Sequence, residues 1–161
     1  MKKSIMLLLL VVLLAFGACR NAKQQEPENP PHFPTVRELA DVVLASVSFP
    51  ATIEHTKQED IELFFGFDLF DEASQYIFIQ QAMSVHLVEL IIIKPSHDGD
   101  TKLIMDYLNA RRDKLMNDVA FYPNQHEAAD ASVAGFKEGY YYLICHEDAK
   151  IAEAVLLELI K

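Results

Sequence analysis

Two cysteines are the residues of this chain whose chemistry depends most on their surroundings. Cys19 stands where an apolar segment ends and a polar one begins, and Cys145 lies within an apolar run, residues 140–145. A thiol can form a disulfide, bind a metal, act as a nucleophile or accept a covalent group. The residues around each cysteine therefore indicate which of these uses applies.

The N-terminus has the pattern of an export signal. Residues 1–3 are short and basic, and residues 5–18 form an apolar stretch that ends in small side chains. A helix needs ~20 apolar residues to span a bilayer, so this stretch is short for a span and typical of the h-region of a signal peptide. We expect residues 1–18 to be removed on export.

The residues just before Cys19 favour covalent modification of its sulfur. Phe16-Gly17-Ala18-Cys19 is similar to the lipobox of bacterial lipoproteins, in which the cysteine receives a diacylglyceryl group and becomes the new N-terminus. The alternative is a plain secretory signal cleaved after Ala18. Several acyl chains give a durable attachment where a single chain binds only marginally. The resemblance implies lipidation at Cys19 and a location on the extracytoplasmic side of the cell membrane.

Residues 19–34 are predicted to form a flexible tether. They hold four of the seven prolines and only one large apolar residue, Phe33. Such a segment cannot bury enough surface to offset the entropy of ordering it.

The charge of the chain argues against nucleic-acid binding. The net charge is −10, and without Lys2 and Lys3 the exported part has 12 basic and 24 acidic residues, a net −12. A surface this negative repels phosphate backbones and anionic lipids. We expect no nucleic-acid partner.

Cys145 has no intramolecular partner once Cys19 is acylated. A disulfide framework is therefore excluded. Within its apolar run we expect Cys145 to be a small buried hydrophobic residue, with a reactive thiol as the alternative.

The remaining residues, 35–161, predict a single α+β domain. Thr35 and Glu38 form a capping box for a helix to about Ser46, a weaker helix follows at 57–65, and a further helical turn is expected at 71–74. The long helix at 100–120 is expected to be capped by Ser96 or Asp98, with residues 111–114 on its polar face.

Four strands are expected, at residues 76–80, 86–94, 131–137 and 140–145. Glu138-Gly139 is too short for anything but a tight hairpin. A final helix follows residues 146–148, with an inward face predicted to consist of Ile151, Ala154, Val155 and Leu159. The order α-α-β-β-α-β-β-α predicts an antiparallel four-stranded sheet with packed helices.

Several motifs in this order resemble one family. They are LADVVL in the first helix, FFGFDLFDEASQYIFIQQAMSVHLVELIIIK, YPNQ after the long helix and KEGYYYLIC before the last one. Over about residues 35–160 the chain resembles bacterial lipoproteins of the domain of unknown function 4358 type. The resemblance implies location and fold and brings no known activity. Cys145 and His146 depart from the family pattern at the last strand end.

Glu89 is the single acid in the strand HLVELIIIK, on the face shared by Leu87, Ile91 and Ile93. It either lies near a sheet edge, accepts hydrogen bonds from a backbone amide or from Arg111 or Arg112, or is a partly buried carboxylate in a ligand groove. If helices covered one side only, this apolar face would be exposed; the alternative is that the N-terminal helices cover it.

The candidate binding residues are Glu89, Tyr122, Gln125 and Tyr141, the last three from the family-like motifs YPNQ and Gly-x-Tyr. No catalytic motif, metal-ligand spacing or cofactor-binding loop is expected; the acids at 96–100 and 146–148 are explained by helix capping. The sequence favours a non-enzymatic module that binds an envelope protein or a small ligand through the sheet face or the residue 122–125 corner. The alternatives are an envelope hydrolase or metal-dependent enzyme using Glu89 with His86 or His146, and a structural spacer.

Overall fold

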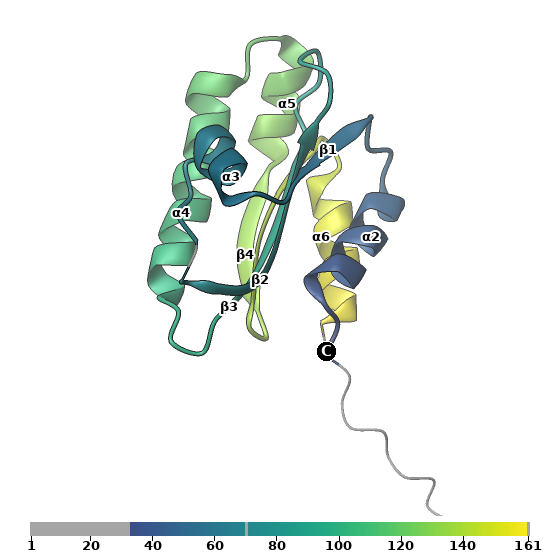
Figure 1. The fold of residues 1–161 in the computed structure, drawn as a ribbon. Helices are drawn as coiled ribbons and strands as arrows, with labels where there is room; N and C mark the ends of the chain where they lie inside the picture. Colours follow the sequence, from purple (N-terminus) through teal and green to yellow (C-terminus); the bar gives the residue numbers. More distant parts are fainter. Residues whose placement is uncertain (1–32, 70, 161) are drawn as a thin grey trace, which may run out of the picture. The chain divides into compact units, whose positions relative to one another are not determined.

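The computed structural model describes residues 33–69 and 71–160. Its centre is a five-stranded sheet in which every neighbouring pair is antiparallel, in the order β1-β2-β3-β5-β4 (Figure 1). The strands are β1 (Thr52–His55), β2 (Ala73–Gln81), β3 (Glu89–Pro95), β4 (Val133–Lys137) and β5 (Tyr140–Cys145). The predicted signal peptide, Cys19 and nearly all of the predicted tether lie outside the described residues.

Helices cover both faces of this sheet. One layer contains α3 (Gln58–Phe65), α4 (Thr101–Lys114), the π-helical turn η1 (Leu115–Val119) and α5 (Pro123–Ala131). The other contains α2 (Val36–Ser46) and α6 (Ala149–Leu159), as Figure 1 shows. The sheet therefore separates two hydrophobic clusters, one under each layer.

The predicted α+β class with an antiparallel sheet is confirmed, and so are several local signals. Thr35 and Glu38 form the capping box at the start of α2. Glu138 and Gly139 both have positive φ, 47° and 84°, as a two-residue type I′ hairpin between β4 and β5 requires.

The predicted number of strands is wrong, because β1 forms a fifth strand at the edge beside β2. Its sequence, Thr-Ile-Glu-His, is short and half polar, so its pairing with β2 decides its conformation. The predicted helical turn at 71–74 is also wrong, since β2 already begins at Ala73. The cap of α4 is Asp100, which accepts from the backbone N–H groups of Lys102 and Leu103, and neither Ser96 nor Asp98.

A further helix, α5, lies where the sequence predicts a connection. It has nine residues, and its inward side chains are small, so its apolar stripe is weak. Pro123 occupies its first turn, a position where proline is favoured because the missing N–H has no helical partner.

The inward face predicted for α6 is wrong. Ala149, Ala152 and Leu156 are buried, whereas Ile151 is 55% exposed and Leu159 40% exposed. The helix is apolar on most sides, so its sequence is compatible with more than one buried stripe. The sheet face below carries Tyr140 and Tyr142, and the small alanines let the helix approach these large rings.

The apolar face of β3 around Glu89 is covered. Leu87, Ile91 and Ile93 are at most 3% exposed and pack in the cluster with α3 and α4. Of the two N-terminal helices only α3 contributes to this cover, because the α2 stripe packs on the opposite face. Because helices cover both faces of the sheet, a binding surface is expected at the ends of the strands.

Candidate functional site

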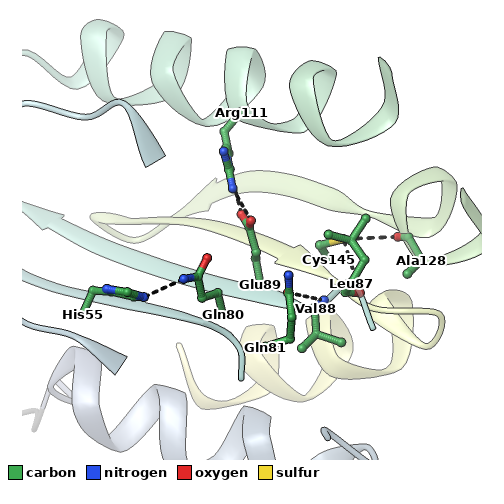
Figure 2. Close-up of polar contacts among 9 residues, drawn as sticks. All are labelled: His55, Gln80, Gln81, Leu87, Val88, Glu89, Arg111, Ala128 and Cys145. Carbon is green, nitrogen blue, oxygen red and sulfur yellow. Dashed lines mark hydrogen bonds and ion pairs between the residues drawn. The ribbon is translucent and has the colours of Figure 1, made fainter. Parts of the chain in front are cut away.

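Glu89 and Arg111 form a buried ion pair between the sheet and α4. Arg111 Nε donates to Glu89 Oε2 at 2.9 Å, and Arg111 Nη2 donates to Glu89 Oε1 (Figure 2). Glu89 is 1% exposed and Arg111 6%. The structure thus shows the interaction with Arg111 that the sequence predicts as one alternative for Glu89. The prediction that Arg111 lies on the polar face of the helix is wrong, because Arg111 is buried.

The spacing of the α4 residues contains the signal for this burial. Arg111 follows Leu108 by three positions and precedes Leu115 by four, and both leucines are fully buried. Residues at these intervals share one helical face. An arginine on an apolar stripe needs a buried acid, and Glu89 is the acid of the facing strand.

The ion pair belongs to a row of polar side chains that crosses the sheet. Gln80, Glu89 and Cys145 are direct cross-strand neighbours on β2, β3 and β5. Gln80 donates from its amide nitrogen to His55 Nε2 at 2.8 Å, which extends the row to β1 (Figure 2). Arg111 also lies over the ring of Phe65, with its Cζ 5.1 Å from the ring centroid.

The electrostatics of this row follow from its burial. Burial raises the pKa of Glu89 above the ordinary 4.5, although the hydrogen bonds and charge of Arg111 act in the opposite direction. Burial also raises the pKa of the Cys145 thiol, and the Glu89 carboxylate adds to this effect. Among the described residues, no buried side-chain nitrogen or oxygen lacks a hydrogen-bond partner.

Cys145 is fully buried, as expected for a small hydrophobic residue. Its Sγ lies 3.6 Å from the carbonyl oxygen of Ala128 and 4.0 Å from that of Leu87. Figure 2 shows Cys145 beside these two residues. Because a thiolate is the reactive form, a raised pKa and burial make this thiol unreactive in the folded state.

The YPNQ motif lies at the start of α5 and holds the loop between β2 and β3. Gln125 is buried; its Oε1 accepts from the backbone N–H of Phe121 at 2.8 Å, and its Nε2 donates to the carbonyl of Ser84 at 2.7 Å. Asn124 Nδ2 donates to the carbonyl of Val85 at 3.1 Å. These two amides therefore fix residues 82–88 against the N-terminus of α5.

Exposed apolar side chains surround the hydrogen bonds of Asn124 and Gln125. Phe121 is 79% exposed, and Met83, Val85 and Tyr122 are each about half exposed. The rings of Phe121 and Tyr122 meet edge to face, with centroids 5.2 Å apart. We call residues 82–88 together with residues 121–125 the α5 corner. The exposed apolar side chains could not be found from the sequence, because periodicity does not predict exposure in loops.

Two hollows adjoin the α5 corner, and Leu87 lines both of them. One, of about 370 Å³, is lined by Leu87, Val119, Phe121 and Tyr122 together with Gln81, Ser84 and Gln125. The other, of about 360 Å³, is lined by residues that include Ser48, His86, Asn124, His146 and Glu147. Neither hollow is lined by Glu89.

The remaining candidates lie apart from one another. Tyr141 is buried against Phe136 at the other end of β5, four residues before Cys145 and so ~13 Å along the strand. His146 accepts from the backbone N–H of Asp148 at 2.9 Å and packs against the ring of Phe49. The structure thus brings Tyr122 and Gln125 together and leaves Glu89 and Tyr141 elsewhere on the sheet.

The described residues contain neither a metal site nor a membrane-spanning helix. No three His, Cys, Asp or Glu side chains gather there in a way that could hold a metal ion. None of the helices in the same residues is long and apolar enough to cross a membrane.

Comparison with known proteins identifies a family. The sequence motifs suggest a resemblance over about residues 35–160, whereas the family model matches residues 45–146, from the end of α2 to the residue after β5. The matched range includes all five strands and the α5 corner. No curated protein and no solved structure matches the chain. Because the matched residues make up more than half of the chain, the protein belongs to the family described as Domain of unknown function (DUF4358).

Proposed function

We propose that the protein is a lipid-anchored, extracytoplasmic binding module of the cell envelope, and that it contacts its partner through the α5 corner. The observation that carries this proposal is the exposed apolar group of Met83, Val85, Phe121 and Tyr122, held in place by Asn124 and Gln125. Exposed apolar groups that are held rigidly are typical of interaction surfaces, because little entropy is lost when a partner covers them.

The α5 corner lies far along the sheet from the first described residues. Pro34, close to the first described residue, accepts a hydrogen bond from Tyr140 Oη at one end of β5. Leu87, which lines both hollows, lies near Cys145 at the other end. The start of the described domain and the α5 corner therefore lie at opposite ends of β5.

The binding proposal is tested by site-specific photocrosslinking in intact cells that express the full chain. A photoreactive amino acid at Phe121 should give a discrete crosslinked product, and the same amino acid at Ile151, an exposed apolar position on α6, should not. Gln125→Ala should weaken the product at 121, because it frees the loop that Gln125 holds. Equal labelling at 121 and 151 would contradict the proposal.

The lipid anchor is tested separately by mass spectrometry of the mature N-terminus. We expect an acylated Cys19 as the first residue, since the lipobox-like residues end there. An unmodified Cys19, or a different first residue, would contradict the anchor without affecting the proposed binding surface.

An envelope hydrolase that uses Glu89 with His86 or His146 stays a prediction. In the structure both carboxylate oxygens of Glu89 accept from Arg111, and the two histidines line a hollow that Glu89 does not reach. The binding module accounts for the α5 corner more directly, and the hydrolase would need Glu89 to exchange Arg111 for a substrate.

A further inference from the structure

The geometry points to a partner segment that presents a bulky apolar side chain next to a basic one, with the apolar side chain in the hollow beside Phe121 and the basic one against Glu147. This inference rests on the proposed binding function and adds the chemistry of the partner to it.

The hollow of about 370 Å³ is suited to an apolar anchor. Leu87 and Val119 form part of its lining, and Phe121 and Tyr122 contribute aromatic rings. Gln125, which also lines it, has its amide already occupied by Phe121, Tyr122 and Ser84 backbone groups. A side chain that enters this hollow therefore contacts two aromatic rings and two aliphatic side chains beside the polar side chains of Gln81, Ser84 and Gln125. Aromatic side chains at the centre of a contact are typical of an interface hot spot.

The neighbouring hollow is suited to a cation. Glu147 lines it and is exposed, and no ion pair of Glu147 is seen within residues 33–69 and 71–160. Leu87 lines both hollows, so they adjoin and one short partner segment can reach both.

The charge of the whole chain favours a basic partner over two other occupants. At a net −10, a second copy of the chain would bring like charges together. An anionic lipid surface would be repelled for the same reason. A basic segment is attracted, and the attraction also speeds its association.

The test measures binding of a labelled amphipathic peptide of leucine and lysine to the full chain in a non-ionic detergent. Two matched peptides serve as controls, one with glutamate in place of lysine and one with serine in place of leucine. We expect only the leucine-lysine peptide to bind. Phe121→Ser and Glu147→Lys should each weaken its binding about tenfold or more, with unchanged circular dichroism spectra.

Two control variants separate a specific site from general attraction to a negative protein. Ile151→Ser removes an exposed apolar side chain elsewhere, and Glu62→Lys makes the same charge change on α3; neither should weaken binding. An equal loss for Glu62→Lys and Glu147→Lys, or no loss for Phe121→Ser, would overturn the inference.

The other occupants give distinguishable results. Self-association that Phe121→Ser abolishes, or binding of phosphatidylglycerol vesicles through the α5 corner, would overturn the basic-peptide inference. If residue 121 forms a crosslink in cells but the chain prefers the glutamate peptide, the proposed function is supported and the inference about a basic partner is wrong. Loss of crosslinking at 121 in cells would instead contradict the proposed function itself.

Discussion

The carboxylate of Glu89 is held by two nitrogens of one guanidinium in the interior of the domain. A pair of this kind costs much desolvation free energy, which the mutual attraction offsets only while both partners are present. Its effect is therefore to fix α4 at one place on β3, and removing a single partner is expected to be far more damaging than replacing both.

Arg111→Ala should lower the free energy of unfolding by about 3–5 kcal/mol, because it leaves a buried carboxylate without a cation. The double change Glu89→Leu with Arg111→Met should restore much of this loss, since apolar side chains need no partner. Chemical denaturation monitored by circular dichroism measures both. As a control, Asp106→Asn breaks the exposed pair with Lys102 and should leave the denaturation midpoint unchanged. A double variant as unstable as Arg111→Ala would contradict this explanation.

Glu89 should also have a distinct effect on the pH dependence of stability. Its pKa is raised in the folded state, so between the unfolded value near 4.5 and the higher folded value the folded chain binds more protons than the unfolded one. The contribution of Glu89 to the free energy of unfolding is therefore fully present below its pKa in the unfolded state. It is lost as the pH rises through its pKa in the folded state. The other acids contribute equally to the protein and to its Glu89→Gln variant, so the difference between their free energies of unfolding isolates the effect of Glu89. This difference should shift in favour of the unmodified protein as the pH falls toward 4.5. A relative loss on acidification would show that the pKa is lowered instead.

At the scale of elements, α6 shows how a helix with apolar residues on most sides is oriented by what lies beneath it. The larger side chains Ile151 and Leu159 face solvent, while Ala149 and Ala152 face the sheet. Tyr140 and Tyr142 occupy that part of the sheet, and small residues on the helix leave room for them.

This orientation can be checked with a pair of substitutions on one helix. Leu156→Ala should lower the free energy of unfolding by about 2–5 kcal/mol, because Leu156 is fully buried. Ile151→Ala should change it by less than about 0.5 kcal/mol, as for other surface positions. If α6 instead presented the stripe predicted from its sequence, the order of the two effects would be reversed.

Considered as a whole, the domain has two hydrophobic clusters that share one sheet. Leu39 on α2 belongs to one cluster and Leu108 on α4 to the other, and both are fully buried. Because neighbouring residues of each strand point into opposite clusters, neither cluster can be lost without the strands that support the other.

Leu39→Ala and Leu108→Ala should therefore each destabilise the entire domain, by about 2–5 kcal/mol, and not only their own layer. Hydrogen exchange measured by mass spectrometry would show this as faster exchange in both helical layers for either variant. Faster exchange confined to the layer of the substitution would mean that the two layers unfold independently.

Much of the local structure follows from short-range patterns. The capping box at Thr35, the hairpin at Glu138-Gly139 and the strand that ends at Cys145 depend on neighbouring residues, so the sequence alone predicts them. Cys19 and its proposed lipidation rest on the sequence alone as well, since they lie outside the described residues.

Only the tertiary structure decided the pairing of β1 and the orientation of α6. The same is true of the α5 corner: the motif YPNQ is visible in the sequence, but Ser84 and Val85, the groups its amides hold, are about 40 residues away. These features depend on contacts between distant segments, whose free energies no local pattern of residues records.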